Sequence, residues 1–129
     1  MRAGNNPRMV AWQNGDWGLL KFLFLVCRDE TIKSTPGEIP RAVEPWLRDV
    51  QSRGVLLQGQ PLEPFSNAVT IRVREGKVMV HVGPFAETAE RIVGFDIIEC
   101  AGMEEAVNEA RRHPMAPFGS VEVRAFVDS

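Results

Sequence analysis

Cysteine, histidine and clustered metal-ligating residues are scarce in this sequence. Its 129 residues include two cysteines, Cys27 and Cys100, and two histidines, His81 and His113. No pair of cysteines stands at CxxC spacing and no histidine cluster completes a ligand set, so no metal is expected. Both cysteines end apolar runs, and we expect them to be small buried residues in a reducing cytoplasm.

Charge balance and missing motifs exclude several classes of function. Fifteen Lys and Arg against 17 Asp and Glu give a net charge of −2. The basic residues are scattered and form no stripe suited to a phosphate backbone, which argues against direct nucleic-acid binding. No GxGxxG, P-loop, HExxH or nucleophile elbow is present, and no cofactor is expected. The apolar run at residues 19–27 is too short to span a bilayer, so we expect no membrane association and a cytoplasmic location.

The chain divides into an N-terminal extension, residues 1–18, and a single domain, residues 19–129. The extension carries Gly, Asn and Pro without periodicity, and Trp12 and Trp17 could anchor it. Residues 19–27 form an almost unbroken apolar run, typical of a strand that is covered on both faces. Because the helices of so short a chain can cover one face, a second subunit is expected to cover the other.

The first helix is predicted within residues 35–54, where apolar residues recur at helical spacing. Thr35, Pro36 and Glu38 fit a capping box with proline at the first helical position. Pro45 would remove a hydrogen bond inside such a helix. Either the helix kinks at Pro45 or its regular part begins there.

The second helix is predicted at residues 103–114. Acidic residues lie in its first turn and an arginine pair in its last, as the helix dipole favours. His113, at the C-terminus, is expected to interact with the same dipole as a protonated imidazole. The predicted buried face consists of Met103, Ala106, Val107 and Ala110.

Residues 69–82 alternate with a period of two around a Glu-Gly turn, which predicts a β-hairpin. The register that this turn sets places His81 opposite Thr70 on the polar face. Further strands are predicted on either side of the second helix. The order β-α-β, hairpin, β-α-β predicts an α+β fold, a ferredoxin-like, mostly antiparallel sheet with two main helices on one face.

Four motifs, "GPFAETAE", "GFDIIE", "EEAVNEARRHP" and "GSVEVRAF", resemble the DGPF (YCII-related) family over about residues 20–127. The resemblance implies a dimeric α+β barrel, in which the sheets of two subunits pack face to face as a homodimer. It also implies a small-molecule ligand and a functional link to a sigma factor. In some members a His–Asp pair is proposed as catalytic. Here Val82 replaces the signature aspartate, and the helical histidine of many relatives would fall near Val43, so that pair is not carried over.

Two weak catalytic candidates remain. His81 has the ionisable side chain suited to proton transfer near neutral pH, although the hairpin register favours an ordinary polar-face residue beside Thr70. Glu87 and Glu90 stand three residues apart after the Gly-Pro-Phe turn. If a short helix starts there, they share a face and could contact a ligand or perform acid–base work; alternatively, they stabilise the helix N-terminus.

Phe85 and Arg124 complete the predicted ligand-binding set with Glu87 and Glu90. Phe85 either plugs the core or lines a pocket. Arg124 either holds a ligand carboxylate or pairs with a nearby acid. Two functions stay open. The absent Asp and His favour a small-ligand-binding or regulatory interaction module without an intact catalytic dyad. The alternative is a cofactor-independent small-molecule enzyme of the proton-transfer, lyase or isomerase type that uses His81, Glu87 or both.

Overall fold

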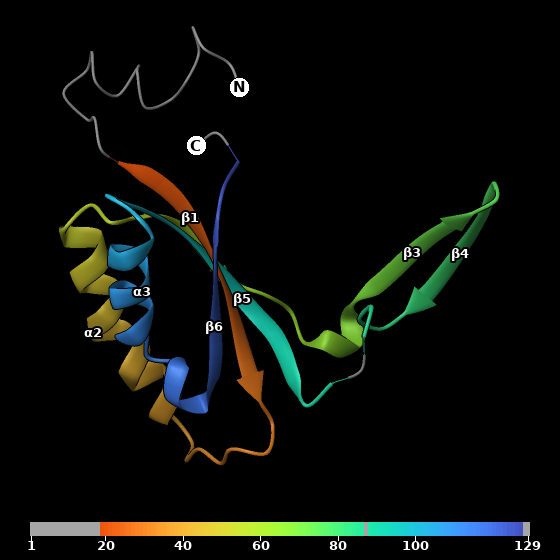
Figure 1. Ribbon diagram of the computed structural model, residues 1–129. Helices are drawn as coiled ribbons and strands as arrows, with labels where there is room; N and C mark the ends of the chain where they lie inside the picture. The colour runs from red at the N-terminus through yellow and green to blue at the C-terminus, as the bar shows by residue number, and fades with distance from the viewer. Residues whose placement is uncertain (1–18, 87, 128–129) are drawn as a thin grey trace, which may run out of the picture.

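Four strands form one antiparallel sheet, and two helices cover one of its faces (Figure 1). The elements are β1 Leu20–Asp29, α2 Glu38–Ser52, β2 Leu56–Pro61, β5 Glu90–Cys100, α3 Met103–Arg111 and β6 Gly119–Ala125. The strand order β2-β5-β1-β6, with two β-α-β crossovers, confirms the predicted ferredoxin-like α+β fold. The computed structural model describes residues 19–86 and 88–127, so the predicted extension, with Trp12 and Trp17, and Glu87 lie outside the described residues.

Strand β1 is apolar on both faces, as its sequence predicts. Phe22, Phe24 and Val26 point towards the helices and are at most 5% exposed. Leu23 and Leu25 alternate with them on the opposite face, where they are half-buried. Both helices lie on the first face (Figure 1). We call the second face, formed by alternate residues of the four strands, the open sheet face.

Helix α2 begins two residues later than predicted. Gly37 has φ 80° and stands before the first helical residue, Glu38, so Pro36 is not in the helix. The Glu38 carboxylate still accepts a hydrogen bond from the Thr35 backbone N–H at 2.9 Å, as in a capping box. Pro45 lies inside α2 rather than at its start. No helix within residues 19–86 and 88–127 is long and apolar enough to cross a membrane.

Helix α3 carries its charges as predicted, but the predicted buried face is wrong in part. Glu104 and Glu105 lie in the first turn and Arg111 in the last. Met103 and Val107, which were expected to be buried, are 46% and 42% exposed. The buried residues of α3 are Ala106, Glu109 and Ala110.

Glu109 is buried because Arg53, at the end of α2, binds its carboxylate. The two guanidinium–carboxylate distances are 2.9 and 3.0 Å, and Arg53 also binds Asp49 on α2. The hydrogen bonds from Arg53 lower the pKa of Glu109 and outweigh the desolvation that would raise it. This ion-pair network joins the two helices side by side.

A separate two-stranded sheet projects away from the body of the protein (Figure 1). Its strands are β3 Val69–Arg74 and β4 Lys77–Val82. The predicted register is confirmed, with His81 opposite Thr70. Glu75 and Gly76 turn the chain with φ of 51° and 78°, as a two-residue hairpin requires. We call residues 69–82 the arm.

The Gly-Pro-Phe turn after the arm does not start a helix. Residues 83–86 and 88–89 have no regular structure, and Glu90 is the first residue of β5. The condition that a short helix starts there is therefore not met in the described residues. The shared helix face that was considered for Glu87 and Glu90 therefore has no helix to support it in the described residues.

Candidate functional site

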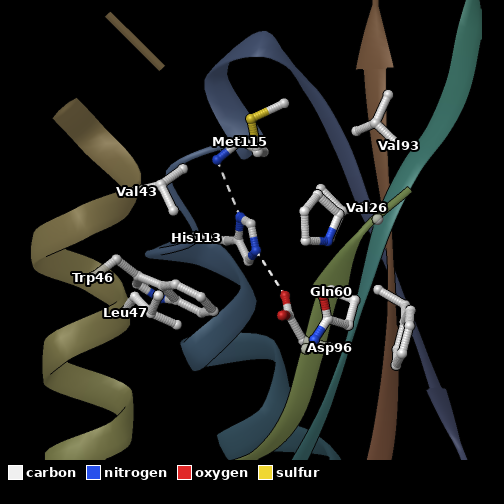
Figure 2. A pocket seen from close by; sticks show the side chains of 13 residues that line it. Val26, Val43, Trp46, Leu47, Gln60, Val93, Asp96, His113 and Met115 are labelled. Carbon is white, nitrogen blue, oxygen red and sulfur yellow. Dashed lines mark hydrogen bonds and ion pairs between the residues drawn. The ribbon is translucent and has the colours of Figure 1, made fainter. Parts of the chain in front are cut away.

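A cavity of about 220 Å³ lies between α2 and the β2–β5 side of the sheet (Figure 2). Apolar side chains from several elements make most of its wall, among them Val26, Val43, Leu47, Val93 and Met115. Two titratable side chains, Asp96 and His113, also line it. Ligand sites are usually apolar hollows with a few polar groups in fixed positions, so this cavity is the candidate site.

Asp96 reaches the cavity because successive side chains of β5 point to opposite faces of the sheet. It shares the helix-facing side of the strand with Ile98 and Cys100, which are 0% and 5% exposed. Asp96 itself is 8% exposed, and a carboxylate buried to this degree needs a partner. That partner is His113, whose Nε2 lies 2.9 Å from Asp96 Oδ2.

The turn that follows α3 holds the His113 ring in place. The Met115 backbone N–H donates a hydrogen bond to Nδ1 at 3.0 Å. Because Nδ1 accepts this bond, the ring proton lies on Nε2 and is donated to Asp96. Both ring nitrogens are therefore engaged. The imidazole holds the carboxylate in position and has no free nitrogen for proton transfer with a ligand.

Aromatic rings hold the imidazole from the side. The Trp46 ring centroid lies 4.4 Å from that of His113, and Phe24 meets His113 edge-on at 6.4 Å. Figure 2 shows the imidazole between Trp46 and Asp96. Trp46 Nε1 is buried without a hydrogen-bond partner among the described residues.

The other carboxylate oxygen, Asp96 Oδ1, is a second polar atom at this cavity, beside Trp46 Nε1, that is left for a ligand. Within the described part of the chain it receives no hydrogen bond, although Oδ2 does. Gly59 on β2 leaves room for it, since a Cβ at that position would lie 2.3 Å from Oδ1. The arrangement places a carboxylate oxygen that can accept a hydrogen bond at a mostly apolar hollow.

The sequence-predicted residues lie elsewhere. His81 is exposed on the arm, beside Gly83, and does not line the cavity. Phe85 is 71% exposed, so the first of its two alternatives, a core plug, is wrong. Phe85 and Glu90 instead line a wider hollow of about 870 Å³ between the base of the arm and the start of β5, which we call the outer hollow. Glu87 lies outside the described residues.

Two predicted ligand contacts have protein partners. Glu90 accepts a hydrogen bond from Ser120 Oγ at 2.8 Å. Arg124 pairs with Glu122 at 3.7 Å, and both side chains are largely exposed, so the pairing alternative fits the structure. The structure thus brings Phe85 and Glu90 to one hollow and places Arg124 outside its lining.

The sequence does contain a pattern that indicates the Asp96–His113 pair, although neither residue was predicted as part of a site. His113 follows Ala110 by three residues and Ala106 by seven, so helical spacing places it near the buried face of α3. Asp96 stands two residues before Ile98, on the buried face of a strand. His113 is 5% exposed and binds Asp96 and the Met115 N–H, so the expected role of a helix-end imidazole that simply serves the dipole does not account for its position.

Comparison with known proteins gives a family match. The sequence model of the YCII-related domain matches residues 23–128, which include the cavity, the arm and the outer hollow. An uncharacterized protein of Rhizobium meliloti (strain 1021) is 45% identical over 65 residues, which are 49% of this chain and 52% of that relative. The chain thus spans about half the length of the curated relative that it matches.

Proposed function

This chain belongs to the YCII-related family, and we propose that it is a small-ligand-binding protein whose binding site is the cavity beneath α2. One observation carries the proposal. Asp96 Oδ1 accepts no hydrogen bond from the residues that the structure describes, while His113 binds the carboxylate through Nε2 and the Met115 N–H through Nδ1. Such a site can select and orient a ligand, and it has no free imidazole nitrogen for acid–base work.

The cavity also restricts the chemistry of the ligand. Its volume of about 220 Å³ lies below the ~300–1,000 Å³ of pockets for drug-sized molecules, so the ligand is smaller than those. Its body is apolar, to match the wall formed by Val43, Leu47 and Val93. It carries one hydroxyl or amine that donates a hydrogen bond to Asp96 Oδ1.

A cofactor-independent enzyme is the competing function. It would need His81 or Glu87 in an enclosed site, because proton transfer requires hydrogen-bond reach of the substrate. His81 is exposed on the arm and lines neither the cavity nor the outer hollow. This placement favours the binding function.

We also propose that the protein is a cytoplasmic homodimer through the open sheet face. Leu23 and Leu25 on β1, with Phe95 and Ile97 on β5, form an apolar centre on this face. The substitution Leu25→Asp should give a monomer by light scattering, and a dimer with an unchanged dissociation constant would contradict this interface.

The link to a sigma factor rests on the family resemblance alone, and co-purification with one would test it.

A thermal-shift screen of small alcohols, amines and heteroaromatic compounds tests the binding function. A bound compound raises the unfolding temperature because it binds only the folded state. The variant Val43→Phe adds a ring at the cavity wall and should lose the shift. His81→Ala is the matched control and should keep it. Shifts that survive Val43→Phe would place the ligand outside this cavity.

A further inference from the structure

The arm has one face of exposed aliphatic side chains. Its register places every apolar residue of β3 opposite an apolar residue of β4, all on the same side of the two-stranded sheet. Each of the six exposes between 55% and 73% of its surface. They are Val69, Ile71, Val73, Val78, Val80 and Val82.

An arm of this composition needs a cover. A two-stranded hairpin is marginally stable in water unless a third strand or another element packs on it. A strand face made purely of apolar side chains is the pattern of a face that is buried. A contiguous exposed apolar patch on a soluble protein marks an interaction site. The apolar face of the arm is therefore a contact surface.

The outer hollow separates the apolar face of the arm from the body of the same chain. Val69 and Ile71 of the arm already form one wall of that hollow, and Phe65 and Ile92 of the body contribute to the rest. The hollow of about 870 Å³ is thus an open cleft between arm and body. None of the described residues fills it, so it is open to a partner.

We propose that the arm is a clasp, which closes on a second copy of this chain and inserts its apolar face against the body of that copy. In a two-fold dimer each copy supplies an arm and a cleft, so every such surface finds a partner. The clasp rests on the proposed homodimer and adds to it a second contact region. A single symmetric association then covers both the open sheet face and the arm.

The size of the two surfaces supports this partner. Stable interfaces involve about 20–30 residues on each side. The strands of the main sheet have 10, 6, 11 and 7 residues, so about 17 residues face the open side, because strand side chains alternate. The six aliphatic residues of the arm bring the total to about 23, within the range for a stable dimer.

Two adjacent residues of β4 give a matched test. Val80 lies on the apolar face and is 64% exposed; Met79 lies on the opposite face, across from Arg72, and is 46% exposed. Val80→Asp should raise the dimer dissociation constant by roughly 100-fold or more, because it places an unpaired charge in the contact. Met79→Asp puts the same charge beside an arginine and should change the constant less than about threefold. Sedimentation velocity over a dilution series measures both constants.

Retention of the far-ultraviolet circular dichroism spectrum checks that each variant folds. A second measurement follows amide hydrogen exchange in residues 69–82, which should slow as the protein concentration rises through the dimer range. A wild-type protein that stays monomeric overturns both the homodimer and the clasp. A wild-type dimer that Val80→Asp leaves unchanged overturns the clasp and keeps the sheet-face dimer. Arm protection that requires lipid vesicles instead of a second copy overturns the clasp as well.

Discussion

His113 Nε2 lies 2.9 Å from Asp96 Oδ2, and the Met115 N–H occupies the other nitrogen of the same ring. The pair joins the turn after α3 to the buried face of β5. Its geometry makes the imidazole a positioning group, since it has no nitrogen left for a ligand. The other oxygen of Asp96 accepts no hydrogen bond from residues 19–86 and 88–127, and it is one of the polar atoms at the cavity.

Removing the histidine should destabilise the fold strongly. His113→Ala leaves the Asp96 carboxylate buried without its partner, which typically lowers the free energy of unfolding by about 3–5 kcal/mol. Urea unfolding measures the loss. His81→Ala, on the exposed arm, is the control and should stay within about 0.5 kcal/mol of wild type. Equal effects of the two substitutions would mean that the pair does not stabilise the fold.

A methyl group at Gly59 should disturb the same pair from the other side. In Gly59→Ala the new Cβ would lie 2.3 Å from Asp96 Oδ1, so either β2 or the carboxylate must move. Such overpacking costs about 1–3 kcal/mol. Adding Asp96→Ala removes the atom that clashes, so the double variant should lose less than the sum of the two single losses. Strict additivity in urea unfolding would contradict the contact.

Acid should weaken the joint between the helices. Arg53 holds the pKa of Glu109 below its ordinary value near 4.5. Around this pH the folded protein therefore binds fewer protons than the unfolded chain does. The contribution of Glu109 to stability is complete above that ordinary value and is lost as the pH falls through the lower folded pKa.

The variant Glu109→Gln should lack this pH-dependent contribution. Its free energy of unfolding should therefore fall less steeply than that of the wild type below about pH 4.5. Urea titrations at neutral and acidic pH measure both slopes. Parallel curves for the two proteins would show that the ion pair is not the source of the pH dependence.

Local sequence patterns predicted the elements but not all of their placements. Period-two alternation and the Glu75-Gly76 turn were enough for the arm register, because a hairpin is set by adjacent residues. The direction in which the arm leaves the body depends on two connecting segments and on packing at its base. Such non-local contacts leave no periodic signal in the sequence.

The candidate site was harder to predict for a similar reason. Asp96 and His113 are 17 residues apart, and their meeting depends on how α3 crosses the sheet. The buried face of α3 was predicted from its apolar residues and included Met103 and Val107, which are exposed. The residue Glu109 is polar and yet buried. The ion pair with Arg53 permits that burial, and long-range pairing of this kind overrides local hydrophobic spacing.

The most direct test of the binding function is a calorimetric titration of the strongest compound from the screen. Wild type, Asp96→Asn and His81→Ala are compared at one pH. We predict that Asp96→Asn weakens the affinity by about tenfold or more, since a hydrogen bond to a charged acceptor contributes roughly 1.5–3 kcal/mol, and that His81→Ala leaves it unchanged. Unaltered affinity in Asp96→Asn, or a loss confined to His81→Ala, would contradict a binding site beneath α2.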